Sequence, residues 1–325
     1  MTKFDYHKIC LDLLSGLDQR QKEIISRRFG LGRDKRETLE SIGKDFGICR
    51  ERVRQIEAAS LNKIKPKTQD HKKVFNYFLN HLKKFGGVRK EEVLLKELGE
   101  DNARNEVYFL LNLREPFKRI NENNDFYSVW IIGEDSYNLA KEVVNSLALQ
   151  FENIKKPLPL EELNSPASLE KRALESYLEA SKKIDKNQDN LYGLSHWPEI
   201  NPKGIKDKAY LVFKKIGKPL HFHEVAKLIE NSHVQTVHNE LIKDNRFVLV
   251  GRGIYALAEW GYYPGQVRDV ILKILQESEE PLTKEEILEK VLKQRLVKKN
   301  TVLLNLSNKQ YFLRDSQGRY RIKEA

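Results

Sequence analysis

Four side chains that can read DNA bases lie close together near residue 50. Arg50, Glu51, Arg54 and Gln55 fall on one face of a helix, because residues three and four apart in a helix lie on the same side. An arginine can hold guanine through two hydrogen bonds, a glutamine can hold adenine, and a glutamate can accept from the cytosine amino group. These residue types at this spacing predict a helix that reads base edges in the major groove.

Two short helices must position these side chains. Leu39, Ile42 and Phe46 recur at helical spacing, Gly47 closes that run, and a second amphipathic run covers residues 50–64. The apolar stripe of the second run consists of Val53, Ile56, Ser60 and Ile64. Two helices joined by so short a turn must cross, which predicts a helix-turn-helix, whose first helix braces the second against DNA.

Three further cations flank the predicted recognition helix. Lys44 lies on the first helix, and Arg52 and Lys63 lie at the side of the second. We expect these three to contact phosphates, which supply affinity and register without sequence information. The alternative is that the charged face is only a solvated surface, which any helix rich in arginine and glutamate offers.

Two longer segments carry a family resemblance. LLSGLDQRQKEIISRRFGL at residues 13–31 and RETLESIGKDFGICRERVRQIEAASLNKI at residues 36–64 closely resemble region 4 of the bacterial sigma-70 family. In that family these helices recognise the −35 element of promoters, and the domain docks on the flap of the RNA polymerase β subunit. The resemblance therefore implies promoter DNA and RNA polymerase as partners. Nothing in the chain resembles sigma region 2, so a complete initiation factor is not implied.

Local signals in the same segment predict how its helices begin and pack. Asp18 and Gln21 have the spacing of a capping box. Cys49 stands where the family usually has Thr or Ser, so we expect helix 50–64 to begin without a side-chain cap. Pro66 and the polar residues around it predict a linker. The domain core is expected between two apolar groups, Ile24, Ile25 and Phe29 on one side and Leu39, Ile42 and Val53 on the other.

Composition limits the class of protein. With 325 residues, 40% of them hydrophobic and 32% charged, the chain is expected to form several soluble domains. A net charge of +11 favours a polyanionic partner. Two cysteines fit a reducing cytosol, and the absence of a signal-like or long apolar stretch predicts a cytoplasmic, nucleoid-associated protein without a membrane contact.

Catalytic and ligand motifs are missing from the sequence. It contains no Walker loop, no GxSxG and no HExxH, and the four histidines between residues 221 and 238 lack a metal-ligand signature. We therefore expect no enzymatic activity, no cofactor, no metal and no small-molecule ligand.

A sequence period of 62 to 67 residues follows the predicted linker. Three prolines open the phrases PLPLEEL, PLHFHEV and PLTKEEI at intervals of 62, and three tryptophans end strand-like stretches at intervals of 67 and 63. These residues are Pro157, Pro219 and Pro281, and Trp130, Trp197 and Trp260. Such recurrence indicates tandem copies of one small domain. We expect the tryptophans to pack in cores, the alternative being that they stack on unpaired bases.

Each copy reads as three helices followed by a hairpin, the order of a winged helix. The predicted copies cover residues 70–132, 134–200, 203–260 and 262–325, the second being divergent. The predicted fold class is mainly α with small β wings: a sigma region 4-like helix-turn-helix at residues 1–66 followed by tandem winged-helix domains.

The third copy also resembles a known family. GKPLHFHEVAKLI, TVHNELIKD and RFVLVGRGIYALAEW are similar to the HARE-HTH winged helix, a module of the RNA polymerase δ subunit and of restriction and chromatin proteins. The resemblance implies DNA or polymerase contact without a particular base readout. In its wing, Arg246 and Arg252 beside two glycines either reach a phosphate or stay solvated, and the sequence favours neither.

These features predict a sequence-specific transcription factor that acts at initiation by substituting for, competing with or tethering a sigma factor. A rival hypothesis is a δ-like accessory subunit of RNA polymerase that acts through protein contacts, in which Ile24 and Ile25 would engage the β flap. A third hypothesis is the DNA-recognition component of a restriction or defence system.

Overall fold

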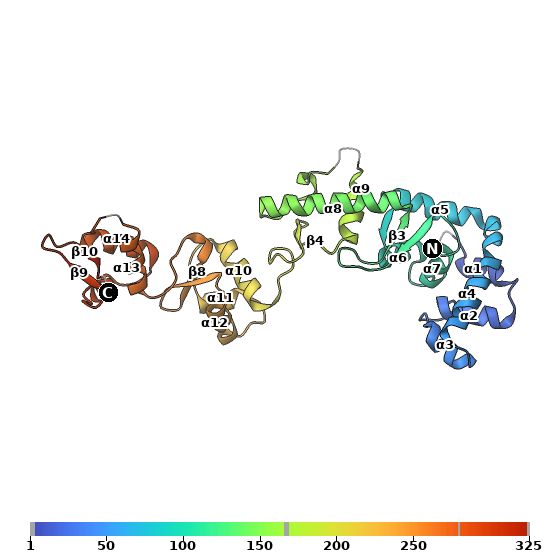
Figure 1. Cartoon of the computed structure of the whole chain (residues 1–325), viewed down its shortest axis with the longest axis horizontal. Helices are drawn as coiled ribbons and strands as arrows, with labels where there is room; N and C mark the ends of the chain where they lie inside the picture. The colour runs from blue at the N-terminus through green and yellow to red at the C-terminus, as the bar shows by residue number, and fades with distance from the viewer. Residues whose placement is uncertain (1–3, 166–168, 279, 324–325) are drawn as a thin grey trace. The chain divides into compact units, whose positions relative to one another are not determined.

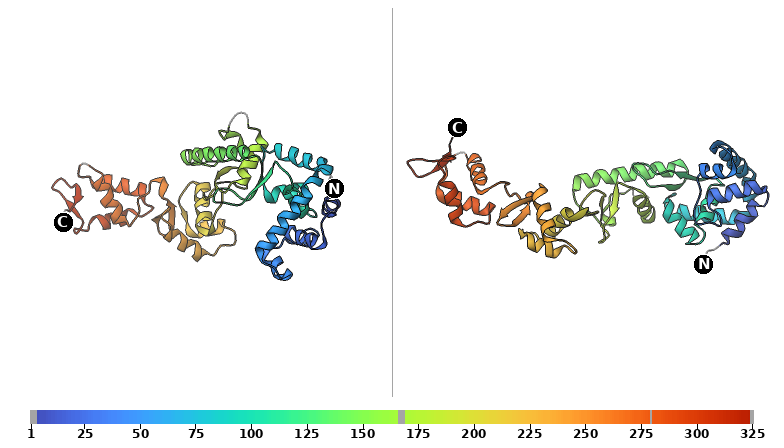
Figure 2. Two further views of the ribbon diagram at one scale, coloured as in Figure 1. Left: turned by 45° about the vertical axis from the view of Figure 1, so that its right-hand side comes forward. Right: turned by 90° about the horizontal axis from the view of Figure 1, so that it is seen from below.

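The computed structural model describes residues 4–165, 169–278 and 280–323. The chain is mainly helical with small antiparallel sheets, and it divides into two compact units, residues 1–196 and 197–325 (Figures 1 and 2). Among the described residues, no helix combines the length and apolar character needed to cross a membrane.

Four helices form the N-terminal part of the first unit. They are α1 (Tyr6–Leu14), α2 (Gln19–Phe29), α3 (Leu39–Phe46) and α4 (Arg50–Ile64) (Figure 1). The capping box of Asp18 and Gln21 begins α2, as its spacing predicts. Gly47 ends α3 in the left-handed conformation, with φ of 63°, which turns the chain sharply into α4. Cys49 precedes α4 without a side-chain hydrogen bond, as expected.

The apolar side chains of α2 point in two directions. Ile24 is fully buried with Ile42 and Val53 in a small cluster between α2, α3 and α4. Ile25 and Phe29 instead join a larger core that continues into the residues after α4. The expectation that all three would face α3 and α4 is therefore right for Ile24 alone, because neighbouring helix positions lie about 100° apart.

The residues around Pro66 are not a linker. They form the 3-10 helix η1 (Lys65–His71), which runs directly into α5 (Lys72–Lys83). Thr68 is buried, and its hydroxyl donates to the Lys65 carbonyl at 2.6 Å. Proline is tolerated in the first turn of a helix, where its missing N–H has no partner to lose. A polar run with a proline is thus compatible with continuous helix.

The first copy contains α5 and a three-stranded sheet. Its other elements are β1 (Val88–Lys90), α6 (Glu91–Gly99), α7 (Arg104–Leu111), β2 (Phe117–Ile120) and β3 (Val129–Ile132), with strand order β1-β3-β2. Trp130 is buried, and its Nε1 donates to Glu91 Oε2 at 3.1 Å. This tryptophan packs in the core, as predicted.

The second copy lacks one α-helix. It consists of α8 (Glu134–Ile154), η2 (Leu160–Glu162), α9 (Lys171–Ala180), β4 (Ile184–Lys186) and β5 (Tyr192–Leu194). Where the other copies have a second α-helix, this copy has only the single 3-10 turn η2 among its described residues.

The second unit holds the third and fourth copies. The third contains α10 (Gly204–Ile216), β6 (Leu220–His221), α11 (Phe222–Leu228), α12 (Val234–Lys243), β7 (Phe247–Gly251), β8 (Ile254–Leu257) and η3 (Ala258–Trp260). The fourth contains α13 (Val267–Gln276), α14 (Lys284–Gln294), α15 (Lys299–Leu306), β9 (Phe312–Arg314) and β10 (Tyr320–Ile322).

One main-chain pairing recurs in all four copies. A residue in the repeated phrase, which in the first copy is the divergent GGVRKEEV at residues 86–93, pairs antiparallel with the second strand of the hairpin in the same copy. The pairs are Val88 with Ile131, Leu158 with Tyr192, Leu220 with Tyr255, and Leu282 with Tyr320. The last three phrase residues follow the three repeated prolines directly. The period in the sequence therefore corresponds to a repeated three-dimensional arrangement.

Helix α7 of the first copy packs against the N-terminal helices. Asn105 Nδ2 donates to the carbonyl oxygens of Gly30 at 3.1 Å and Arg33 at 3.0 Å. The rings of Phe29 and Phe109 meet edge to face, with their centroids 5.1 Å apart. The helix-turn-helix and the first copy thus share one core.

Helix α9 of the second copy packs in turn against β1 of the first. Ser176 Oγ donates to the Val88 carbonyl at 2.6 Å, and Tyr177 Oη donates to the Gly86 carbonyl at 2.8 Å. The helix-turn-helix and the first two copies therefore form one continuous packed unit.

We predict that Glu97 of α6 makes folding sensitive to acid. Burial raises the pKa of Glu97, but hydrogen bonds with His81 and Arg89 outweigh burial and lower the pKa to about 2. A carboxyl with a lowered pKa stabilises the fold above its unfolded pKa of about 4.3, and this contribution disappears as pH falls toward 2. In urea unfolding, the stability difference between the wild type and Glu97→Gln should shrink by about 2 kcal/mol from pH 6 to pH 2, less than the full value of the pKa difference because water screens this partly exposed carboxylate. A difference independent of pH would contradict this assignment, and Glu92→Gln, an exposed change on the same helix, is the control.

We also predict that Cys49→Ser stabilises the protein. Residue 49 already has the extended conformation of an N-cap, with φ of −70° and ψ of 156°, and lacks only an oxygen acceptor. Supplying one should raise the free energy of unfolding by about 0.5–1 kcal/mol. Cys49→Ala is the matched control, since it shortens the side chain without adding an acceptor. Equal stabilities of the two variants would show that no cap forms.

Candidate nucleic-acid interface

The structure places the four predicted base-reading side chains on one exposed face of α4. Arg50, Glu51, Arg54 and Gln55 are all solvent-exposed, and they occupy the first turns of the helix. The opposite face carries Val53, which is fully buried against α2 and α3. The helix therefore has its apolar side on the scaffold and its polar side available to a ligand.

Three of these side chains, those of Glu51, Arg54 and Gln55, take part in hydrogen bonds within α4. Arg54 Nη2 donates to Glu51 Oε1 at 2.7 Å, and Arg52 Nη1 donates to Gln55 Oε1 at 3.1 Å. The Arg54 hydrogen bond lowers the pKa of Glu51 and raises that of Arg54, so both stay charged. An exposed ion pair contributes little to stability because water screens it. Arg54 can therefore exchange Glu51 for a base at small cost.

The three predicted phosphate contacts lie at different distances from this surface. Lys44 on α3 and Arg52 on α4 are exposed. Lys63 lies in the last turn of α4, about 20 Å along the helix axis from Arg50 at 1.5 Å per residue. Its Nζ lies 3.4 Å from Gln21 Oε1, at the start of α2. Arg52 therefore lies among the base-reading residues, whereas Lys63 lies near the opposite end of the same helix.

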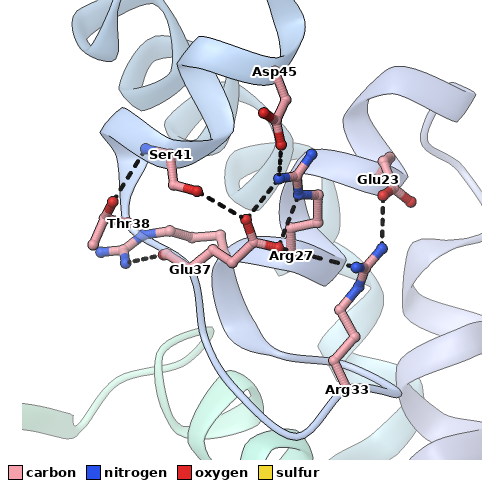
Figure 3. A network of polar contacts seen from close by, with 8 residues as sticks. Glu23, Arg27, Arg33, Glu37, Thr38, Ser41 and Asp45 are labelled. Carbon is pink, nitrogen blue, oxygen red and sulfur yellow. Dashed lines mark hydrogen bonds and ion pairs between the residues drawn. The ribbon is translucent and has the colours of Figure 1, made fainter.

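A polar network that the sequence did not reveal fixes α3 (Figure 3). Arg27 Nε donates to Glu37 Oε1 at 2.9 Å, and Arg27 Nη2 also contacts the carboxylate of Asp45 near the end of α3. Hydrogen bonds from Arg27 raise its own pKa and lower that of Glu37. Ser41 Oγ donates to the same Glu37 carboxylate at 3.2 Å. Arg27 therefore joins α2, the following loop and α3.

The neighbouring Arg28 makes the equivalent connection to α4. Its Nη1 donates to the Glu37 carbonyl at 3.1 Å, and its Nε donates to Glu57 Oε2 at 3.4 Å. Arg27 and Arg28 are thus positioning residues for the helix-turn-helix. Their partners lie 9 to 29 residues away at no regular spacing, so no sequence signal could have identified these pairs.

The two wing arginines of the third copy have different surroundings. Arg246, for which the sequence left phosphate contact and solvation equally open, instead pairs through Nη2 with Asp207 Oδ1 at 2.8 Å and Asp244 Oδ2 at 2.6 Å. The hydrogen bonds that Arg246 donates to the Asp244 carboxylate raise the pKa of Arg246. Arg246 therefore fastens the hairpin to α10, because two carboxylates compete with any phosphate. Arg252 is exposed at the hairpin turn.

The histidines of the third copy have structural roles. His221 is the N-cap of α11, and its Nδ1 accepts from the His223 backbone N–H at 3.3 Å. The His238 ring stacks on Phe222, with centroids 4.2 Å apart. His221 therefore caps a helix, and His238 packs on an aromatic ring.

The N-terminal segment of the chain is similar in sequence to known proteins. Residues 13–65 match the family model of Sigma-70, region 4. The RNA polymerase sigma factor SigA of a Bacillus species is 46% identical over 54 residues, which cover 17% of this chain and 14% of that protein. The chain therefore spans only a small part of that relative's length.

A solved structure covers more of the chain but resembles it weakly. The crystal structure of the bacterial selenocysteine-specific elongation factor EF-Sec aligns over 81% of this chain and 40% of that chain, with 16% identity. Its TM-score is 0.22, which is too low to support an argument. The informative match is thus the segment that contains α2, α3 and α4. Its similarity to sigma region 4 supports a DNA-binding role related to transcription.

Proposed function

We propose that this protein binds promoter DNA during transcription initiation and that α4 reads the bases. One observation carries the proposal: the matched segment exposes two arginines, a glutamate and a glutamine at the N-terminal end of its recognition helix. In a helix-turn-helix, this end of the second helix meets base edges in the major groove. Arg50, Glu51, Arg54 and Gln55 would read bases, and Lys44, Arg52 and Lys63 would hold phosphates.

We further infer that the four copies are winged helices and that the third is of the HARE-HTH type. The repeated order of helices and hairpin supports this inference, as does the pairing of each phrase residue with the second hairpin strand. These domains would extend contact along DNA or onto RNA polymerase. The chain would then substitute for, compete with or tether a sigma factor, by binding rather than catalysis.

RNA polymerase is the protein partner that the sigma similarity suggests. Ile24 and Ile25, which we expected to engage the β flap in an accessory subunit, are both fully buried inside the unit. Side chains without exposed surface cannot dock on a partner unless the fold opens. A polymerase contact would therefore involve other residues of this domain.

A δ-like accessory subunit remains the second candidate function. The resemblance of the third copy to the HARE-HTH module of the RNA polymerase δ subunit favours it. DNA readout predicts an affinity for one duplex sequence that falls steeply with salt. An accessory subunit should instead co-purify with RNA polymerase and bind every duplex weakly. Selection of bound duplexes from a random pool, followed by a salt titration, separates these functions.

We predict that two substitutions on the helix-turn-helix differ in their effect on sequence preference. Arg54→Ala should weaken binding to the selected duplex about 10- to 100-fold and relax preference at one base pair. Lys44→Ala should weaken binding to all duplexes alike, because a phosphate contact carries no sequence information. Equilibrium binding to the selected duplex and to duplexes changed at single positions measures both effects. Lys8→Ala, an exposed change on α1, is the control. Uniform losses on every sequence from both substitutions would remove the readout assignment.

A further inference from the structure

The residues of the third helix of each copy are mostly buried in the first unit and mostly not buried in the second. Five of the eight residues of α7 and six of the ten residues of α9 are buried. In contrast, only two of ten are buried in α12 and two of eight in α15. The first two copies therefore use this helix for packing within the chain, whereas the third and fourth copies leave it exposed.

The hairpins of the copies also differ in charge. The hairpin of the first copy, residues 117–132, contains two cations, Lys118 and Arg119, and two acidic residues, Glu122 and Asp125. The hairpin of the fourth copy, residues 312–323, contains four cations and one acidic residue. Its cations are Arg314, Arg319, Arg321 and Lys323. Only the fourth copy thus combines an open third helix with a strongly basic hairpin.

Strand register places three of these cations on one face. Arg321 pairs with Leu313 in the ladder of β9 and β10, and hydrogen bonds extend the ladder past both ends of β10. Residues 319, 321 and 323 therefore alternate with Tyr320 and Ile322, which pack against the core of the fourth copy. Successive cations on the outer face are about 7 Å apart, two residues at 3.3 Å each.

These cations have few competing partners. Among the described residues, no acidic side chain forms an ion pair with Arg321 or Lys323, and both are exposed. Arg319 Nη1 lies 4.0 Å from Glu280 Oε2, at the limit of an ion pair. Two more exposed lysines, Lys298 and Lys299, stand at the start of α15. This arrangement contrasts with Arg246 of the third copy, which two carboxylates hold.

We propose that the fourth copy binds the phosphate backbone of duplex DNA through the outer face of β10, as a second contact besides α4. The inference rests on the proposed DNA-binding function and extends it to a named surface. Charge complementarity supports it: residues 262–325 contain 13 lysines and arginines against 9 acidic residues, whereas residues 134–200 contain 8 against 12. Lysine and arginine contacts to phosphate are independent of sequence, so this surface raises affinity for any duplex.

Single-stranded nucleic acid fits this surface less well. Binding of single strands depends on aromatic side chains on which bases stack. The aromatic residues of this hairpin region, Tyr311 and Tyr320, are only partly exposed, and the guanidinium groups of Arg268 and Arg314 lie over their rings. A row of cations without free aromatic faces suits a regular phosphate backbone.

The test uses the full chain and a salt titration of duplex affinity. Each lost phosphate contact reduces the slope of log affinity against log salt by about 0.9. Arg321→Gln combined with Lys323→Gln should therefore lower the magnitude of the slope by about 1.8 on duplexes of any sequence. The control is Lys284→Gln combined with Lys290→Gln, which removes two exposed charges from α14 and should leave the slope unchanged. Arg321→Lys combined with Lys323→Arg keeps both charges and should also preserve the slope of the wild type.

Other outcomes would overturn the proposal. An unchanged slope for the glutamine pair, in a variant whose thermal midpoint equals that of the wild type, would exclude the surface. So would an equal loss in the α14 control, or a greater loss on single-stranded DNA or duplex RNA than on duplex DNA. Base preference tested with Arg54→Ala reports separately on α4. Suppose that Arg54→Ala leaves the base preference unchanged while Arg321→Gln combined with Lys323→Gln lowers the salt slope. Base reading by α4 is then excluded, and the phosphate contact of the fourth copy is supported.

Discussion

Presentation of the recognition helix depends on the packing of α2 on two sides. Ile24 enters the cluster with Ile42 and Val53, while Ile25 on the adjacent position enters the core shared with the first copy. Complete burial of such an isoleucine contributes about 1.5–3 kcal/mol relative to an exposed side chain. Because both sides of α2 are occupied, α3 and α4 cannot shift without disturbing the core behind them. The first copy thus serves as a rigid base for the helix that would meet DNA.

The same packing covers the third helix in the first two copies and leaves it exposed in the last two. The third helix of a copy is the element best placed to enter a groove in a winged helix, yet α7 and α9 are covered by other parts of their own unit. Within that unit, the polar face of α4, the proposed recognition helix, stays exposed. Under the same proposal, a further nucleic-acid contact would fall on the second unit, where α12 and α15 are exposed. Copies of one arrangement would in this way serve as scaffold in the first unit and as binding surface in the second.

Features set by local spacing could be predicted from the sequence, and features set by tertiary partners could not. Three features follow from residues that lie within a few positions of each other. They are the capping box at Asp18, the end of α3 at Gly47 and the exposed face of α4. The period of the repeats is likewise visible because similar phrases, each opened by Pro-Leu, recur at an interval of 62 residues. In contrast, the partners of Arg27 lie 10 and 18 residues away, and those of Arg246 include Asp207 at a separation of 39. The linker assignment failed because a polar sequence with a proline is equally compatible with a helix whose first turn contains that proline.

Surroundings, more than residue type, decide which arginines are available to DNA. Arg54 and Arg246 both pair with a carboxylate close in sequence, but the Arg54 pair is exposed on both sides whereas Arg246 is held by two carboxylates that are largely buried. Water already weakens the first pair, so a base or phosphate can replace Glu51 with little loss. Removing Arg246 from its site would leave two partly buried carboxylates without a partner, which is costly. Release of Arg54 would also free Glu51 to accept from a cytosine amino group, so one exchange can supply two base contacts on the same helix face.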